Sequence, residues 1–316
     1  MGFEGLLGNA RLKENLSASI GRGHISHFYL ISGPKGSGKK TLAKLLAAAI
    51  LCTGGDRPCG SCPACRKVVG NGHPDFITVD DPEKKTVPVE LVRKARADMY
   101  IQPNESDYKI YLFPRAQDME DPSQNALLKV LEEPPSYGIF ILLTNSPEKL
   151  LPTVRSRCTE LALTALPEDV LRTQLKAQFP KAAPERIDSA MVRSGGYLGQ
   201  AIRLLKSRNT SEKLTAFADS YIRRDPVALL QVLVPMEKWK REMLVPELEL
   251  WLQTLQSALS CRSGMAPIST EAQQISAARS GSDLMKAIQT LKKVLEYAQR
   301  NVSVGAICGY LEWELR

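Results

Sequence analysis

Four short and almost wholly apolar runs in the first half of the chain constrain its fold more than any other feature. Patterns typical of helices separate these runs. The runs are Phe28–Ile31, Phe76–Val79, Lys109–Phe113 and Ile139–Leu143. Continuous apolar strands are usually buried on both faces, and strands that alternate with helices pair in parallel. The sequence therefore predicts an α/β fold in which helices cover both sides of a parallel sheet.

The rest of the chain has no comparable strand signal. After about Leu163, prolines punctuate short helices that run to about Lys206, and longer amphipathic helices follow. We expect three domains: an α/β domain over residues 1–163, a small helical domain over residues 164–208 and a helical bundle over residues 209–316.

The net charge is +8, from 42 Lys and Arg against 34 Asp and Glu, and the pI is near 9.1. This charge is compatible with a nucleic-acid partner, but the basic residues form only pairs and triplets, such as Lys39–Lys40, which are typical of a solvated surface. The longest apolar run, Leu45–Cys52, is too short to span a membrane. The N-terminal segment lacks the basic region of a secretory signal, so we expect a cytoplasmic protein.

A glycine-rich segment follows the first apolar run and opens a helix that we expect to begin near Thr41. Backbone N–H groups of such a loop converge on phosphate oxygens, and the helix N-terminus adds favourable charge. Lys39 would reach the outer phosphates. Lys40 replaces the serine or threonine that would hold Mg²⁺, and Thr41 is rotated by about 100° around the helix. We expect ATP or ADP to bind without a productive Mg²⁺ site; a plain strand-to-helix connection is the alternative. The candidate binding residues are Gly33, Gly36, Ser37, Gly38, Lys39, Lys40 and Thr41.

The strand that should supply metal-binding carboxylates ends without them. In ATPases with such a loop, a second strand ends in an acidic residue that holds Mg²⁺, and a further group positions the attacking water. Lys109–Phe113 has the pattern of that strand, but Pro114 and Arg115 follow it. Asp80 is better explained as a turn residue, and Asp121 as the cap of the next helix. We therefore expect no ATP hydrolysis by this chain on its own.

Four cysteines, at positions Cys52, Cys59, Cys62 and Cys65, lie in a short segment rich in turn residues. Their C-x6-C-x2-C-x2-C spacing lets four thiolates surround one Zn²⁺ with no open position, which is a structural rather than a catalytic arrangement. A reducing compartment favours metal binding over disulfides. The sequence predicts a structural zinc module over residues 52–65, with four unlinked thiols as the alternative.

Further motifs follow the strand predicted over Lys109–Phe113. They are Asn125–Pro135, with the sequence NALLKVLEEPP, then Thr144–Asn145 and Ser156–Arg157–Cys158. Together with the glycine-rich loop and the cysteine module, these motifs resemble the bacterial clamp-loader subunits of the AAA+ family, strongly from about Gly5 to Leu163 and more weakly beyond. The resemblance implies that the small helical domain is a lid. It also implies that the C-terminal bundle joins a collar of subunits through helices that include Asn301–Val302 and Leu311–Leu315, although a self-contained bundle is the alternative.

Two types of subunit in this family are relevant: the ATP-hydrolysing gamma/tau type and the delta-prime type of the DNA polymerase III holoenzyme. In the family, the hydrolysing type keeps a serine or threonine after the loop lysine, Asp-Glu after the second strand and an arginine in the lid that senses the γ-phosphate. This chain has Lys40, Pro114–Arg115 and Gly199 at these places. The resemblance therefore implies a delta-prime-like, non-hydrolysing subunit of a DNA-directed DNA polymerase.

The resemblance also gives Arg157 a function. In the family, this arginine projects into the ATP site of the neighbouring subunit, where its guanidinium stabilises charge on the γ-phosphate. Arg157 would then be catalytic in trans, and Arg155 is a weaker second candidate. The implied partners are gamma/tau-like ATPase subunits and a delta-like subunit in a hetero-oligomer. Through that complex the chain would help to load the sliding clamp on primed DNA during DNA replication.

Two other functions stay open. One is an active clamp-loader ATPase of the gamma/tau type with an unconventional metal site. The other, suggested only by the net charge, is a nucleic-acid-binding module of the same fold. Mg²⁺-dependent ATP turnover by the isolated chain would identify the first, and tight, salt-sensitive binding of DNA would identify the second.

Overall fold

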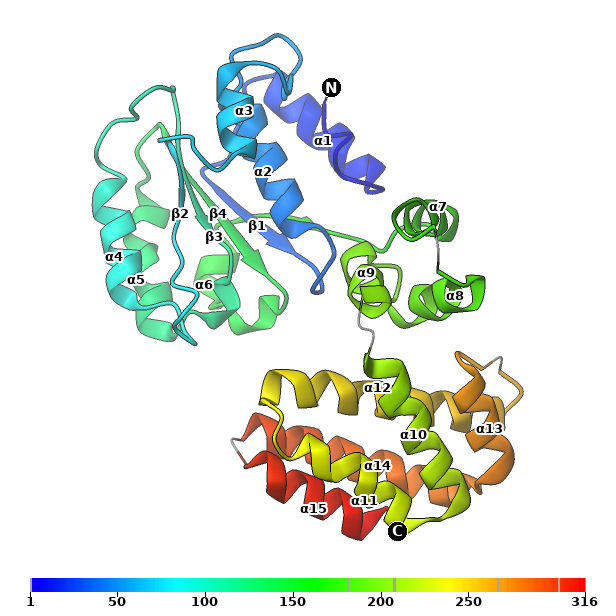
Figure 1. Ribbon diagram of the computed structural model, residues 1–316. Coiled ribbons are helices and arrows are strands. Elements are labelled where there is room, and N and C mark those ends of the chain that lie inside the picture. Colours follow the sequence, from blue (N-terminus) through cyan, green and yellow to red (C-terminus); the bar gives the residue numbers. More distant parts are fainter. Residues whose placement is uncertain (1, 181, 207–208, 266, 301, 316) are drawn as a thin grey trace. The chain divides into compact units, whose positions relative to one another are not determined.

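The computed structural model describes most of the chain (Figure 1). The described ranges are residues 2–180, 182–206, 209–265, 267–300 and 302–315. They form two compact units, which are Met1–Gln178 with Gly195–Gln200, and Phe179–Ser194 with Ala201–Arg316. The division into three domains stays a prediction, and its boundary at residue 208 lies outside the described ranges.

A five-stranded parallel sheet forms the centre of the first unit, in the order β2-β3-β4-β1-β5. The strands are β1 (Phe28–Ser32), β2 (Phe76–Thr78), β3 (Lys109–Phe113), β4 (Gly138–Thr144) and β5 (Thr159–Ala162). The four predicted strands are confirmed. Strand β5 was missed because only Leu161 among its four side chains is buried, as suits a strand at the edge of a sheet.

Helices cover both faces of this sheet, because its side chains alternate in direction. Ile110 and Leu112 of β3 pack on one side in a core that includes side chains of α1 and α2. Tyr111 and Phe113 pack on the other side with α4 and α5. The helices of this unit are α1 (Ala10–Gly21), α2 (Lys39–Ile50), α3 (Pro63–Val69), α4 (Val89–Asp98), α5 (Asp121–Glu132), α6 (Pro152–Arg155) and α7 (Glu168–Gln178), with short 3₁₀ turns η1 (Ala116–Asp118) and η2 (Pro147–Lys149). The α/β fold class is thus confirmed (Figure 1).

Two predicted helix starts were wrong. Helix α2 begins at Lys39 and not near Thr41, because Gly38 in a left-handed conformation directly precedes the first turn. Helix α5 begins at Asp121, with Glu120 as its N-cap residue and no side-chain cap hydrogen bond, so Asp121 is not the cap. One side of α5 is apolar and buried; it comprises Ala126, Leu127, Val130 and Leu131.

The second unit is helical. Its core centres on Trp251, whose ring stacks on Phe217 at a centroid distance of 4.0 Å. Its helices are α8 (Pro184–Arg193), α10 (Asn209–Arg223), α11 (Pro226–Met236), α12 (Arg241–Cys261), α13 (Thr270–Ala278), α14 (Gly281–Gln299) and α15 (Val304–Glu314), and α9 (Leu198–Lys206) begins in the first unit and continues in this one. Among the described residues, no helix is both long and apolar enough to cross a membrane.

Candidate functional site

The glycine-rich loop connects β1 to α2 at the carboxyl edge of the sheet. Gly36 and Gly38 have φ angles of 86° and 99°, a region that side chains with a Cβ rarely adopt, so these two positions need glycine. Gly38 is the N-cap of α2, and the first N–H groups of that helix have no partner within it. The backbone therefore has the form of a phosphate-binding loop.

The side chains of the loop are engaged differently from the expectation. The ammonium of Lys39 donates to the carbonyl oxygens of Gly33, at 2.6 Å, and of Pro34, at 2.9 Å. Burial lowers the pKa of Lys39. The hydroxyl oxygen of Ser37 is buried and has no hydrogen-bond partner among the described residues, whereas Lys40 and Thr41 are exposed. Lys39 is thus bound by its own loop, and neither Lys40 nor Thr41 forms a metal-binding position.

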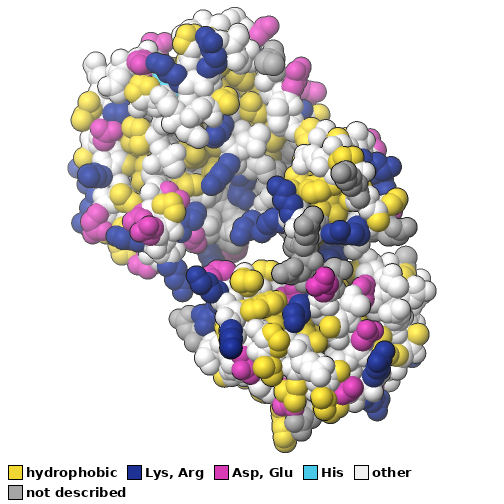
Figure 2. Space-filling model, viewed as in Figure 1, with side chains coloured by type: hydrophobic (Ala, Val, Ile, Leu, Met, Phe, Trp, Pro, Cys, Tyr) yellow, Lys and Arg dark blue, Asp and Glu magenta, His cyan; other side chains and the backbone are white. Residues whose placement is uncertain are grey.

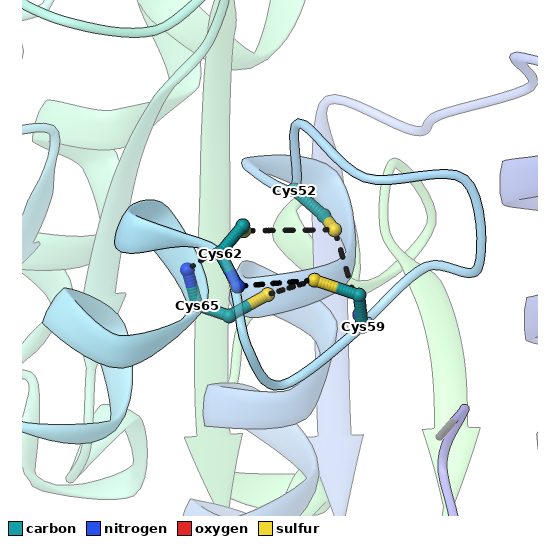
Figure 3. A group of neighbouring side chains, drawn as sticks. All are labelled: Cys52, Cys59, Cys62 and Cys65. Carbon is teal, nitrogen blue, oxygen red and sulfur yellow. Dashed lines mark hydrogen bonds between the residues drawn. The ribbon is translucent and has the colours of Figure 1, made fainter.

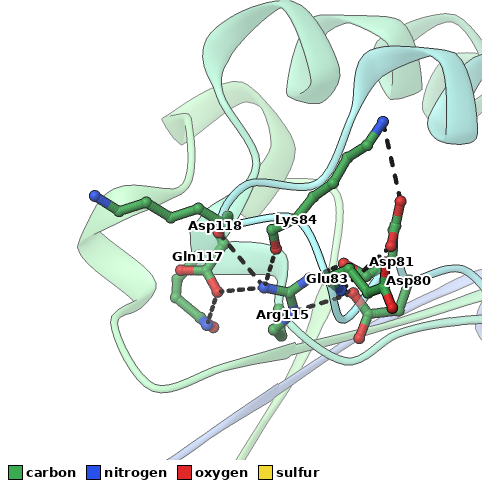
Figure 4. A network of polar contacts seen from close by, with 8 residues as sticks. Asp80, Asp81, Glu83, Lys84, Arg115, Gln117 and Asp118 are labelled. Carbon is green, nitrogen blue, oxygen red and sulfur yellow. Dashed lines mark hydrogen bonds and ion pairs between the residues drawn. The ribbon is translucent and has the colours of Figure 1, made fainter. Parts of the chain in front are cut away.

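Arg115 organises the exit of β3 (Figure 4). Its Nε and Nη2 atoms donate to Asp80 Oδ1 at 3.0 and 2.7 Å, and its other contacts include the carbonyl oxygens of Asp81, at 2.8 Å, and Lys84, at 3.1 Å. The hydrogen bond to Asp80 is the main cause of the raised pKa of Arg115. Asp118 lies 3.8 Å from the same guanidinium. At the position where a hydrolytic site would have a metal-binding carboxylate, Arg115 therefore neutralises the nearby acids.

This network refines the prediction for the acidic residues. Asp81 is a turn residue, since its Oδ1 accepts from the N–H of Glu83 at 3.3 Å. Asp80 does more than form a turn, because it pairs with Arg115 from the neighbouring strand exit. The signal was available in retrospect: β2 and β3 are neighbours and parallel, so the residues that follow them meet at one edge.

The four cysteines of the predicted zinc module point toward one another (Figure 3). Cys52 follows α2, Cys62 is the N-cap of α3, and Cys65 lies in the first turn of α3. All four sulfurs lie within 4.8 Å of one another, with Cys52 to Cys62 at 3.9 Å and Cys59 to Cys65 at 4.0 Å. Thiolates at about 2.3 Å from a tetrahedral Zn²⁺ lie about 3.8 Å apart. The donor set therefore fits zinc.

Backbone N–H groups surround these sulfurs. The N–H of Cys62 points at Cys59 Sγ at 3.3 Å, and that of Cys65 at Cys62 Sγ at 3.4 Å. Burial opposes ionisation of Cys62, but hydrogen bonds from Cys65 and Thr53 lower its pKa to about 5. Burial raises the pKa of Cys65 to about 12. A bound cation would stabilise the thiolate form of all four cysteines.

Arg157 lies in the exposed turn between α6 and β5. Its Nη1 donates to the carbonyl of Thr153 at 3.0 Å, and its Nη2 forms an ion pair with Glu132 at 3.3 Å. The buried Gln124 fixes the approach to this turn, because it accepts from the N–H of Leu151 at 2.7 Å and donates to the carbonyl of Lys149 at 3.1 Å. Neither Glu132 nor Gln124 was predicted, although both lie in α5, Glu132 within the motif Asn125–Pro135 and Gln124 directly before it.

Arg157 and the glycine-rich loop lie at opposite ends of the strands, Arg157 at their amino ends and the loop at their carboxyl ends. The loop follows the last residue of β1, whereas Arg157 precedes the first residue of β5, which pairs in parallel with β1. Strand β1 has five residues, so at about 3.3 Å per residue its two ends are about 16 Å apart. Arg157 therefore cannot reach phosphates held by the loop of its own chain.

The first half of the chain matches a known protein family. The family model described as "DNA polymerase III, delta subunit" matches residues 8–167, which is 160 of the 316 residues. The matched segment contains the glycine-rich loop, the cysteine module, Arg115 and Arg157. Just over half of the chain is thus covered by one family model.

Individual relatives agree with this assignment. DNA polymerase III subunit gamma/tau of Mycobacterium bovis is 33% identical over 200 residues, or 61% of this chain and 34% of the relative. DNA polymerase III subunit delta' of Pseudomonas aeruginosa is 33% identical over 182 residues, or 56% of this chain and 55% of the relative. These matches thus span from about a third to about half of the relatives' own length.

One solved structure, a gamma subunit-related protein of DNA polymerase III from Thermotoga maritima, covers 96% of this chain and 99% of its own at 16% identity and a TM-score of 0.48. At a TM-score below 0.5, this likeness supports no conclusion about fold or function.

Proposed function

Since this chain belongs to the family of DNA polymerase III delta subunits and is a clamp-loader subunit, we propose that it acts as the non-hydrolysing, delta-prime type. In this role it joins gamma/tau-like ATPase subunits and a delta-like subunit in a hetero-oligomer. It contributes Arg157 to the ATP site of a neighbour and helps to load the sliding clamp on primed DNA. Its own glycine-rich loop has no hydrolytic function.

The position of Arg157 carries this proposal. It lies in an exposed turn at the amino ends of the strands, whereas the loop lies at their carboxyl ends, and 39% of its side chain is accessible. A guanidinium placed there can act only on a phosphate that another molecule presents, where it would stabilise the charge of phosphoryl transfer. A motif that is buried or directed at its own loop would not support action in trans.

The present partners of Arg157 are easily exchanged. Glu132 is itself 58% accessible, and an exposed ion pair contributes only about 0–1 kcal/mol. A γ-phosphate offers more charge and more acceptor oxygens than one carboxylate. Docking against a nucleotide-bearing neighbour would therefore draw Arg157 away from Glu132 at little cost.

The loop side of the molecule supports a non-hydrolysing chain. The exposed Lys40 follows the loop lysine, and Arg115 takes the place of an acidic residue after β3. Asp80, which follows β2 by two residues, could be an alternative metal-binding carboxylate, but it is already paired with Arg115. A hydrolytic site needs a carboxylate that is free to hold Mg²⁺ and another group that positions water. Neither is provided by Pro114, Arg115 or Asp80.

We assign Cys52, Cys59, Cys62 and Cys65 to a structural Zn²⁺ site. The spacing of the sulfurs and the absence of a fifth ligand position in the set support a closed, tetrahedral centre. Such a metal would fix the turn-rich segment between α2 and α3 and supplies no chemistry to the nucleotide.

The helical bundle supports assembly through a collar. Val227, Leu230 and Val234 of α11 are 62%, 38% and 51% exposed, although the opposite side of this helix is already buried in the unit. A helix that is apolar on all sides is normally covered. Trp313 of α15 is 69% exposed, and Figure 2 shows apolar side chains on the surface of the helical unit. These faces are suited to neighbouring subunits; the predicted contact at Asn301 lies outside the described residues.

A second function, an active gamma/tau-like ATPase, is favoured by one observation: several relatives are named as gamma or tau subunits. It requires a metal site that does not use the residues after β3. Mg²⁺-dependent ATP turnover by the purified chain alone, at rates above a Lys39→Ala control, would replace the first function with this one.

The decisive experiment uses Arg157→Ala in a complex reconstituted with the ATPase subunits and clamp. We expect ATP turnover at the site that Arg157 serves to fall by about 10³-fold, as for arginine fingers elsewhere, while the melting temperature of the chain is unchanged. Arg155→Ala, an exposed arginine two residues earlier, is the matched control and should keep most of the activity. Equal activity of the Arg157→Ala and wild-type complexes would remove Arg157 from the mechanism.

A further inference from the structure

A direct backbone contact joins the glycine-rich loop to Gly199. The N–H of Gly199 donates to the carbonyl oxygen of Gly36 at 3.0 Å. Both residues belong to the first unit. Gly199 is the second residue of α9, and the N–H groups of a first helical turn have no acceptor within their own helix. The carbonyl of Gly36 therefore caps α9 from the loop.

The two backbone segments approach so closely here that neither position has room for a side chain. A Cβ on Gly199 would lie 2.9 Å from both the Cα and the oxygen of Gly36. A Cβ on Gly36 would lie 2.5 Å from the nitrogen of Gln200 and 2.8 Å from the carbonyl carbon of Gly199. Contacts this short are not found for real Cβ atoms, so both glycines are required. Gly199 is therefore more than the place where an arginine is missing.

Two other polar side chains of the loop, Lys39 and Ser37, are also directed at the loop itself. Lys39 donates to the carbonyls of Gly33 and Pro34 instead of projecting away from the loop. The buried hydroxyl of Ser37 would lie 2.8 Å from a Cβ on Gly33, which shows how closely the loop is folded on itself. A bound phosphate would need the ammonium of Lys39 and would compete with the carbonyl of Gly36 for the N-terminus of α9.

We propose that the hydrogen bond from Gly199 to Gly36 is a lock that closes the loop against nucleotide. Binding of a nucleoside di- or triphosphate requires the segment Gly195–Gln200 to leave the loop and Lys39 to turn outward. Because the closed form competes with the ligand, the apparent affinity falls by the fraction of molecules that are open. The lock goes beyond the proposed function, which does not say whether the loop is open to nucleotide.

Gly199→Ala tests the lock with little other disturbance. Gly199 has no positive φ angle in the left-handed region, so alanine fits its backbone and fails only at the contact with Gly36. Gly21→Ala is the matched control, since Gly21 is also helical, in the same unit, with nothing within 4 Å of an added Cβ. The full chain is titrated with a fluorescent ADP analogue, and hydrogen exchange of the amide at position 199 is measured on the same samples.

We expect the wild type and Gly21→Ala to protect the amide at position 199 and to bind the analogue weakly or not at all. The Gly199→Ala variant should lose protection of this amide and bind the analogue at least tenfold more tightly, with hydrogen exchange in the cysteine module unchanged.

Three results would overturn the lock. The wild type could bind the analogue tightly while its Gly199 amide stays protected, which would mean that ligand and contact coexist. The variant could lose protection without any gain in binding, or keep its protection, which would mean that the contact does not exclude the ligand or is not as close as described. None of these results involves the ATPase activity of the complex, so the function of Arg157 is tested separately.

Discussion

The glycine-rich loop and the turn that carries Arg157 belong to one sheet but differ in where their polar groups are directed. At the loop, Lys39 bonds to its own backbone and Gly36 accepts from Gly199. At the turn, Arg157 is exposed, and its partners among the described residues are Glu132 and the carbonyl of Thr153. Groups that are satisfied within the chain are costly to recruit for a ligand, whereas an exposed guanidinium in a weak ion pair is available to one.

The same contrast separates Arg115 from Arg157. Arg115 is bound by Asp80 and by several carbonyls, so its guanidinium stabilises the loop that follows β2. Arg157 has the same side chain but fewer hydrogen bonds to its surroundings. Two identical side chains of one domain thus differ in how available they are to a partner, because their neighbours differ.

Metal removal should have the largest effect on the stability of the loop side. The purified chain should contain about one zinc per molecule, and Cys62→Ser or a strong chelator should release it and loosen residues 51–70, because the four sulfurs lose the cation that holds them together. Elemental analysis and hydrogen exchange measure this. Exchange in the turn at Arg157 should stay unchanged, as should the zinc content of Cys261→Ser, whose cysteine lies outside the cluster. Less than about half an equivalent of metal in the wild type would contradict the site.

Arg115→Ala should have an intermediate effect. It removes the donors to Asp80 and to the carbonyls of the following turn, which should cost about 1–3 kcal/mol of unfolding free energy and speed hydrogen exchange over residues 80–85. Urea unfolding measures the cost. The ATP turnover of a complex that contains Arg115→Ala should remain near wild type, unlike that with Arg157→Ala. A loss of turnover as large as that of Arg157→Ala would place both arginines in one mechanism and remove the contrast.

The smallest effect is expected from restoring the missing residue types. A chain with Lys40→Thr, Pro114→Asp and Arg115→Glu carries the residues of a hydrolytic site, yet the contact between Gly36 and Gly199 persists. We expect Mg²⁺-dependent ATP turnover by this isolated variant to stay at the wild-type background. A clear gain in turnover would indicate that the three residues alone account for the inactivity, and that the lock has no part in it.

Much of the fold was predictable because burial leaves a local mark. Strands β1, β3 and β4 are buried along their whole length and mostly apolar, and helix α5 has a stripe of buried residues at helical spacing. Strand β5 lacked that mark because it lies at an edge with one buried side chain. The cysteine module was also predictable, because the ligands of one metal lie close together in sequence.

The sequence by itself determined the class of fold, the cysteine set and the residue types that the loop lacks. The tertiary structure alone decided what fills the place of those residues. Asp80 and Arg115 meet because β2 and β3 are neighbours, and Gly36 meets Gly199 across more than half of the chain length. Such pairings depend on contacts between distant segments, where no periodicity or spacing connects the partners. For the same reason, Arg157 could be recognised from its motif, but its separation from the loop of its own chain follows only from the parallel pairing of β1 and β5.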